Sequence, residues 1–164
     1  MLVLGLDPGS LHTGYGLIEA RGSTLGIVAH GRLSCRRGQP LPDRLRELAL
    51  GLDQLLDRYR PEAAAVEAPF YGPSARSLIV LAEARGALLA VLAGRGIAAC
   101  EYSPAEVKAA VTGNGRADKT QVARMVGLLL GAAASWSADA GDALAIAICC
   151  AHRRRLDALR TASV

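Results

Sequence analysis

The amino-acid sequence predicts an α/β fold with a five-stranded mixed sheet flanked by helices. Short apolar segments alternate with longer segments in which leucine recurs at helical spacing, a pattern typical of α/β proteins. The first three predicted strands follow one another without a helix, whereas helices separate the last two, so we expect antiparallel and parallel neighbours in one sheet. The length of 164 residues suits a single domain, 1–164, around one core.

Turn signals separate the predicted strands at the start of the chain. Leu2–Leu6 is a short apolar run that ends at the turn-forming sequence Asp7-Pro8-Gly9-Ser10. Two further strands are predicted over 13–19 and 26–34, because glycine and serine favour a turn between them at 21–23. Strands joined by such short connections are expected to pair antiparallel.

A helix and two more strands follow. Leucines at helical spacing predict an amphipathic helix over 41–59, which ends before Pro61. The apolar segment 63–67 predicts a fourth strand, which again ends on an acid, Glu67. We then expect a loop over 69–76, a long helix rich in alanine and leucine over 77–95, and a short fifth strand over 97–101.

Capping signals mark the later helices. Capping-box spacing, in which a capping side chain is followed three residues later by Glu or Gln, occurs at Ser103 with Glu106 and at Asp118 with Gln121. The predicted helices span 103–111, 118–130 and 139–156. Three strands, a helix and then alternating strands and helices match the ribonuclease-H-like arrangement.

Four acidic residues predict a metal site. Asp7 and Glu67 end the first and fourth strands, and the carboxyl ends of parallel strands form the ligand-binding edge of an α/β sheet. Asp139 and Asp142 are three residues apart at the start of a helix, so they share one face. Each acid alone could be a turn residue, a cap or an exposed strand end, but four acids from three places suit a hard cation with oxygen ligands.

The chemistry expected of such a site is hydrolysis of a phosphodiester bond. Two Mg²⁺ or Mn²⁺ ions about 3.5–4 Å apart would stabilise the attacking and the leaving oxygens. No Lys or Arg lies between Arg124 and Arg153, so we expect the counter-charge of Asp142 to be a cation from solution. Without metal the crowded carboxylates should repel one another, and one or more should hold a proton at neutral pH.

The positive charge of the chain is nearly all arginine. There are 19 basic and 15 acidic residues, and the two lysines are Lys108 and Lys119. Arginine binds phosphate with two parallel hydrogen bonds, which favours a nucleic-acid partner, although an ordinary solvated surface also explains a mild excess. The run Arg153-Arg154-Arg155 is interpreted as the C-terminal end of a helix, where cations are favoured.

The cysteines and the N-terminus favour a cytoplasmic protein. None of Cys35, Cys100, Cys149 and Cys150 forms a C-x-x-C pair, so we expect reduced, mostly buried thiols and neither a zinc site nor disulfides. The chain starts without a basic segment and carries a charge at Asp7, unlike a signal peptide. No uncharged apolar run approaches the ~20 residues that cross a bilayer, so no membrane partner is expected.

An aromatic pair lies in the predicted loop just after Glu67. Phe70 is the single phenylalanine of the chain, and it stands beside Tyr71 among proline and glycine. An exposed aromatic side chain there could stack on an unpaired base, and the alternative is that Phe70 folds into the core. Further candidates for phosphate contacts, on charge alone, are Arg76, Arg116 and Arg124.

Several segments together resemble the RuvC family of bacterial Holliday-junction resolvases, collinearly over residues 2 to about 152. The matching segments are Leu4-Gly5-Leu6-Asp7-Pro8-Gly9-Ser10, Thr13-Gly14-Tyr15-Gly16, Val66-Glu67 followed by Phe70, Val107-Lys108, Lys119, and Asp139-Ala140-Gly141-Asp142-Ala143-Leu144-Ala145-Ile146-Ala147. The first and last segments are specific in combination, whereas either alone would be weak.

The resemblance implies a homodimer that places two symmetric, metal-dependent nicks in a four-way DNA junction and leaves 5′-phosphate and 3′-hydroxyl ends. It also implies cooperation with the RuvA–RuvB branch-migration complex in the bacterial cytoplasm. The residues to which it assigns roles are the catalytic, metal-binding acids Asp7, Glu67, Asp139 and Asp142, the DNA contacts Lys108 and Lys119, and Phe70, which stacks on bases at the crossover.

Two other functions share parts of this pattern. A phosphotransferase of the actin and sugar-kinase class carries a similar Asp-x-Gly turn, but 164 residues cannot supply its second lobe. A catalytically inactive nucleic-acid-binding module of the same fold would not need four acids. ATP turnover would identify the first alternative, and metal-dependent cleavage would exclude the second.

Overall fold

The computed structural model describes residues 1–68, 74–133 and 135–161. The predicted class, a five-stranded mixed sheet flanked by helices, is confirmed. The strands are β1 (Leu2–Asp7), β2 (His12–Arg21), β3 (Thr24–Ser34), β4 (Ala63–Glu67) and β5 (Ala99–Tyr102). The helices are α1 (Leu41–Tyr59), α2 (Ala75–Gly94), α3 (Pro104–Thr112), α4 (Lys119–Leu130) and α5 (Ala138–Thr161).

The strand order β3-β2-β1-β4-β5 brings the ends of β1 and β4 together. β1, β2 and β3 pair antiparallel, as predicted, whereas β4 is parallel to β1 and β5 is parallel to β4. Leu6 is the register partner of Val66, so the residues that follow them, Asp7 and Glu67, stand side by side at one edge of the sheet. This is the ligand-binding edge of a parallel α/β sheet.

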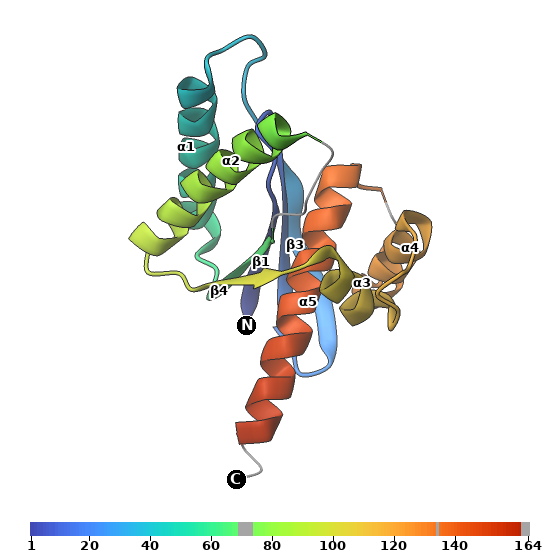
Figure 1. Ribbon diagram of the computed structural model, residues 1–164. Helices are drawn as coiled ribbons and strands as arrows, with labels where there is room; N and C mark the ends of the chain where they lie inside the picture. The colour runs from blue at the N-terminus through green and yellow to red at the C-terminus, as the bar shows by residue number, and fades with distance from the viewer. Residues whose placement is uncertain (69–73, 134, 162–164) are drawn as a thin grey trace.

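Helices cover both faces of the sheet, and strand alternation decides which residues face which helices (Figure 1). α1 and α2 lie on one face, where they bury Leu4 and Leu6 of β1. α5 lies on the other face and buries Val3. Because side chains alternate along a strand, Asp7 shares the α5 face with Val3, and Glu67 shares it with Ala65, which is also in the α5 cluster.

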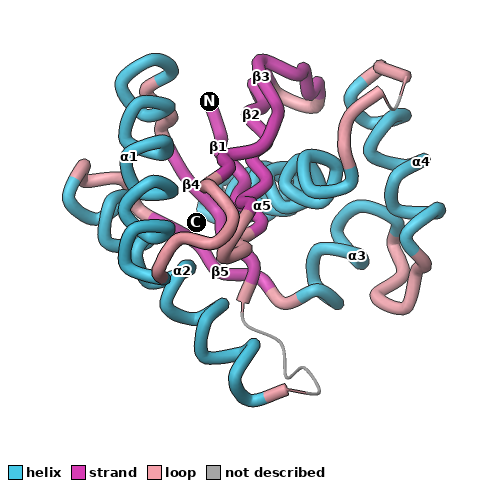
Figure 2. The backbone as a smooth tube through the Cα atoms, turned by 90° about the horizontal axis from the view of Figure 1, so that it is seen from above, coloured by secondary structure: helices cyan, strands magenta, loops and turns pink. Residues whose placement is uncertain are grey.

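Glycines let α5 approach the sheet closely. A Cβ atom at Gly5 would lie 2.1 Å from the Ala143 carbonyl oxygen, and one at Gly14 would lie 2.1 Å from the Asp139 carbonyl oxygen. Gly5 lies on β1 and Gly14 on β2, so the missing side chains leave a flat surface on which the helix backbone rests. The first turns of α5 therefore lie directly over the end of β1. Figure 2 shows this end of the molecule from above, with α5 between the strands and the α3–α4 pair.

Several predicted boundaries differ from the observed ones by one or two residues, and the differences at α2 and α5 change how particular residues are interpreted. α2 begins at Ala75 because the Ser74 hydroxyl accepts a hydrogen bond from the Ser77 amide at 3.3 Å, so Arg76 belongs to the helix and not to a loop. α5 continues to Thr161, past the sheet, so Arg153-Arg154-Arg155 do not mark its C-terminus. Arg153 instead forms an ion pair at 3.8 Å with Glu106 on α3. Both predicted capping boxes are confirmed.

Candidate active site

Three elements bring the four predicted acids to one place. Asp7 and Glu67 come from the ends of β1 and β4, and Asp139 and Asp142 come from the first turns of α5. The Ser137 hydroxyl accepts a hydrogen bond from the Ala140 amide at 3.4 Å, which fixes the start of that helix. The other three carboxylates all act on Asp7, because the negative charge of each raises the pKa of Asp7.

The surroundings of Asp7, Glu67 and Asp142 favour the protonated forms of these three acids. Burial, followed by the negative charges of Glu67, Asp142 and Asp139, raises the pKa of Asp7 to about 7. Burial also raises the pKa of Glu67 and that of Asp142, with a smaller contribution from a neighbouring aspartate in each case. The predicted repulsion among the carboxylates is therefore present, and Asp7 is partly protonated at neutral pH.

Two cationic side chains supply counter-charges that the sequence did not reveal. The Lys119 ammonium nitrogen lies 3.9 Å from a carboxylate oxygen of Asp142. A guanidinium nitrogen of Arg32, on β3, lies 3.6 Å from a carboxylate oxygen of Asp139. The search for a counter-charge of Asp142 along the chain therefore missed Lys119, because the sequence does not show that α4 packs beside α5. The expected cation from solution stays a prediction.

A cavity of about 320 Å³ connects the acids with both lysines. Its polar lining residues are Glu67, Lys108, Lys119 and Asp142, and α3, α4 and α5 provide its apolar wall. Lys119 and then Lys108 lower the pKa of Glu67, which shows that their charges act at the carboxylates. The structure thus places the two predicted DNA-binding lysines beside the acids.

The backbone around the two strand-end acids is held by specific hydrogen bonds. The buried Thr13 hydroxyl donates to the Gly9 carbonyl oxygen at 3.2 Å and fixes the turn that follows Asp7. On the other strand, Arg85 of α2 donates from Nε to the Glu67 carbonyl oxygen at 3.2 Å and forms an ion pair with Glu101. These contacts restrict the positions of the acids and so prepare the site.

The donor set fits a hard divalent cation, although the side chains are not arranged as ligands. In the part of the chain that the structure describes, no three Asp, Glu, His or Cys side chains converge closely enough to hold an ion as they stand. Four carboxylates nevertheless offer only oxygen ligands, and a cation would relieve the repulsion that raises the pKa of Asp7.

The remaining predicted contacts do not join the acids. Arg76 is exposed in the first turn of α2. Arg116 is exposed between α3 and α4, where its amide donates to the Asn114 side-chain oxygen at 3.0 Å. Phe70 and Tyr71 lie outside the described residues.

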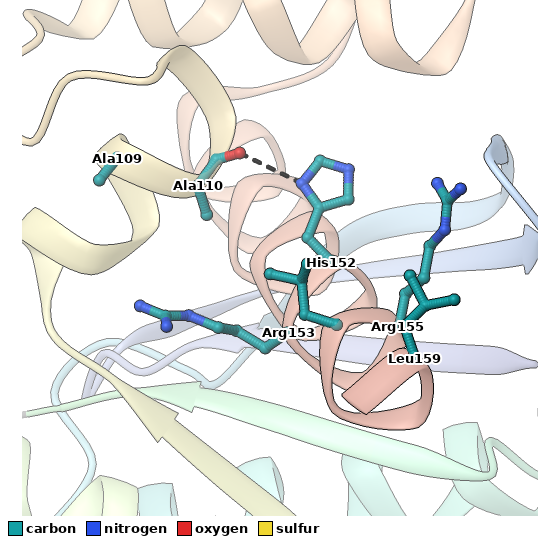
Figure 3. Close-up of a pocket in the computed structure, with 7 residues that line it drawn as sticks. Ala109, Ala110, His152, Arg153, Arg155 and Leu159 are labelled. Atoms are coloured by element: carbon teal, nitrogen blue, oxygen red, sulfur yellow. Dashed lines mark hydrogen bonds between the residues drawn. The ribbon is translucent and has the colours of Figure 1, made fainter. Parts of the chain in front are cut away.

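A larger cavity, of about 540 Å³, lies away from the acids between α3 and the last turns of α5 (Figure 3). His152 points at α3, with its Nδ1 3.2 Å from the Ala110 carbonyl oxygen. The lining is apolar apart from His152, Arg153 and Arg155, and it offers no carboxylate. Because hard cations need oxygen donors, this cavity does not suit the expected metal.

Known proteins are similar to this chain in sequence over most of its length. The family model for crossover junction endodeoxyribonuclease RuvC matches residues 3–150. The RuvC protein of Anaeromyxobacter dehalogenans is 49% identical over 154 residues, which cover 94% of this chain and 82% of that protein. The RuvC protein of Citrifermentans bemidjiense is 42% identical over 159 residues, which cover 97% of each chain.

Solved structures give the same result. The structure of T. thermophilus RuvC in complex with a Holliday junction substrate has a TM-score of 0.90 and 32% identity and covers 96% of each chain. A yeast mitochondrial Holliday junction resolvase, at 16% identity and a TM-score of 0.70, shares the fold. Together with the T. thermophilus structure, it confirms the predicted ribonuclease-H-like arrangement of the sheet and helices. On the strength of the family match and of these identities, the chain belongs to the RuvC family of crossover junction endodeoxyribonucleases, the Holliday-junction resolvases.

Proposed function

We propose that this chain resolves four-way DNA junctions by two symmetric, metal-dependent nicks that leave 5′-phosphate and 3′-hydroxyl ends. The observation that carries the proposal is the grouping of four carboxylates with two lysines at one end of the sheet. The T. thermophilus relative, which is described in complex with a Holliday junction substrate, supports the choice of substrate.

Asp7, Glu67, Asp139 and Asp142 would hold the metal, as two Mg²⁺ or two Mn²⁺ ions. When bound, such ions would supply a nucleophile at neutral pH and stabilise the leaving 3′ oxygen. The part played by the chain is to hold several negative charges in a partly buried place, where their attraction for a divalent cation is less screened than at an exposed surface.

Lys108 and Lys119 would bind the DNA backbone beside the acids. Since they line the same cavity as Glu67 and Asp142, a phosphate that they bind is held next to the carboxylates. A lysine binds phosphate as a point charge, so this contact orients the strand without reading its sequence.

Other residues would bind the junction further from the acids. Arg76 and Arg116 are exposed and available to phosphates of the junction arms. Phe70 and Tyr71 would stack on bases that are unpaired at the crossover, a contact worth about 1–3 kcal/mol per base.

A homodimer would supply the second nick, and α2 is the best candidate for its interface. This helix of 20 residues buries only Ala84, Leu88 and Leu92, although it is mostly apolar, and Ile79 is 60% exposed. Its length and mean hydropathy of 1.7 would also suit a membrane span. A membrane span is unlike this helix in one respect, because Arg85 on α2 contacts Glu67 and Glu101 of the sheet. We therefore propose that a second copy of the chain covers the exposed face of α2.

The RuvA–RuvB branch-migration complex is a further proposed partner, supported by family membership alone.

The test is incubation of the purified protein with a synthetic four-way junction or a linear duplex of the same sequence, in Mg²⁺, Mn²⁺ or EDTA. Paired symmetric nicks in the junction alone, only with metal, are the expected result. Asp142→Asn should bind the junction without cutting it, because the amide keeps the shape of the side chain and loses affinity for metal. The control Asp157→Asn changes an exposed acid on the same helix and should cut normally.

Each other outcome has a defined meaning. Equal cutting of junction and duplex would keep the carboxylate site and reject junction selectivity. Tight junction binding without cutting under any condition would favour an inactive binding module, and ATP turnover would favour the phosphotransferase class. Wild-type cleavage by Asp142→Asn would remove Asp142 from the metal site.

A further inference from the structure

Arg32 lies beside Asp139 and does not line the cavity that holds the two lysines. On β2, Gly14 is the register partner of both Asp7 on β1 and Arg32 on β3, so the three residues form a row across the sheet. All three face α5, because paired residues of neighbouring strands point to the same side. Since Gly14 has no side chain, the first turn of α5 fills the middle of the row and places Asp139 3.6 Å from Arg32.

A second contact holds β3 against the start of α5. His30 points to the same side of β3 as Arg32, and its ring meets that of Trp136 edge-on at 5.8 Å between centroids. Trp136 fits there because Gly141 has no side chain, since a Cβ atom at Gly141 would lie 2.9 Å from the indole nitrogen. Arg32 is thus presented to the site by a fixed strand.

The ion pair between Arg32 and Asp139 contributes little to stability. The two side chains are 46% and 39% exposed, and water screens the attraction between charges that are exposed to this degree. Lys119 and Asp142 form a comparable pair about one turn further along the same helix. Each of the two α5 acids thus has one cationic neighbour, and one of those neighbours is a lysine already proposed to bind DNA.

We propose that Arg32 binds a backbone phosphate of the cleaved strand beside Asp139, separate from the phosphate that Lys108 and Lys119 bind. The inference rests on the proposed function and adds a contact to it. When Asp139 binds a metal ion, its negative charge no longer neutralises Arg32, and the metal adds a positive charge close to the guanidinium group. An anion must then neutralise the guanidinium group, and the planar group matches the geometry of a phosphodiester.

The test compares Arg32→Ala and Arg32→Lys with Arg21→Ala. Arg21 is a matched control, because it is an exposed arginine paired with an acid, Glu19, at the far end of the same antiparallel strands. Junction affinity is measured over a range of salt concentrations in Ca²⁺, a hard cation that the carboxylates can bind, before any cutting has occurred. The same measurement in EDTA, where Asp139 still pairs with Arg32, is the metal-free reference. Mg²⁺ binding is measured by calorimetry without DNA.

We expect Arg32→Ala to weaken junction binding about three- to tenfold and to reduce the slope of log affinity against log salt by about 0.7–0.9. Arg32→Lys should restore most of the slope, and Arg21→Ala should match the wild type. Mg²⁺ binding by Arg32→Ala should be equal to or tighter than that of the wild type, because Asp139 has lost a competitor.

Two results would overturn the inference. The first is an unchanged junction affinity and salt slope in Arg32→Ala. The second is a loss of Mg²⁺ affinity with unchanged junction binding, which would mean that Arg32 only positions Asp139. Both results leave the proposed function intact as long as the wild-type protein cuts junctions. Failure of the wild type to bind or cut a junction would instead reject the proposed function.

Discussion

At the scale of single residues, Asp7 dominates the electrostatics of the site. Its pKa of about 7, against an ordinary value of 3.8, means that the folded protein binds a proton there more tightly than the unfolded chain does. Stability from this group is therefore fully present below about pH 4, falls as the pH rises towards 7 and stays low above it. A bound divalent cation would remove this pH dependence by replacing the proton.

Replacement of Asp7 by asparagine should therefore stabilise the metal-free protein at high pH. At pH 8 in EDTA we expect Asp7→Asn to be more stable than the wild type by about 1–3 kcal/mol, and at pH 5 the difference should shrink. Added Mg²⁺ should stabilise the wild type more than the variant. Urea unfolding at both pH values, with and without Mg²⁺, measures these differences.

The control for that experiment is Asp157→Asn, which alters an exposed acid distant from the site and should follow the wild type at both pH values. A variant at position 7 that loses stability between pH 5 and pH 8 as steeply as the wild type would show that Asp7 is not the source of the pH dependence.

The four acids were predictable from sequence because each lies at an element boundary, whereas Arg32 was not. At the turn between β2 and β3, Arg21 is the register partner of Thr24. If that register continued without interruption, Gly14 would be opposite Gly31, and the Arg32 side chain would point to the other face of the sheet. An irregularity at Leu17/Ile18 shifts the register by one residue and places Arg32 opposite Gly14. Neither periodicity nor composition marks that shift.

At the scale of elements, the close contact between α5 and the sheet aligns the acids. Ordinary capping and periodicity predicted where α3 and α4 begin, because those signals are local. The length of α5 was underestimated because the basic run 153–155 was interpreted as the end of the helix. The actual partner of Arg153, Glu106, follows only from the tertiary packing of α3 against α5. The need for glycine on β1 and β2 likewise cannot be predicted without knowing that α5 packs directly against those positions.

Substitution of Gly14 by alanine should displace the start of α5. The added methyl group would overlap the Asp139 carbonyl oxygen, and relief of such overpacking costs about 1–3 kcal/mol of stability. Because Asp139 and Asp142 would move with the helix, we expect at least a tenfold loss of junction cleavage in Mg²⁺. Thermal unfolding and a cleavage time course measure the two effects.

Gly26→Ala is the matched control, since a Cβ atom at Gly26 on β3 meets nothing within 4 Å. It should keep wild-type cleavage and stability. If Gly14→Ala behaved in the same way, close packing of α5 on β2 would not be what positions the acids.

At the scale of the whole molecule, the exposed face of α2 suggests how one active site becomes two. Ile79, Ala82, Gly86 and Ala90 are exposed at helical spacing, and small residues of this kind let two helices approach closely. Arg85, on the same helix, hydrogen-bonds to the backbone of Glu67. If two copies paired through α2, this contact would connect the dimer interface directly to the strand that carries Glu67 in each copy. Twofold pairing would also match the twofold symmetry of a four-way junction.

Gly86→Arg tests this arrangement. A Cβ atom at Gly86 meets nothing within 4 Å, so the variant should fold, but a bulky charge on the exposed face should prevent two α2 helices from pairing. We expect light scattering to show a dimer for the wild type and a monomer for the variant. Leu50→Arg, at a 46% exposed leucine on α1, is the control and should stay dimeric.

A monomeric Gly86→Arg should bind junctions more weakly and give single, unpaired nicks, because the acids remain in place while the second site is lost. A dimeric Gly86→Arg, or paired nicks from a monomer, would contradict the proposed role of α2.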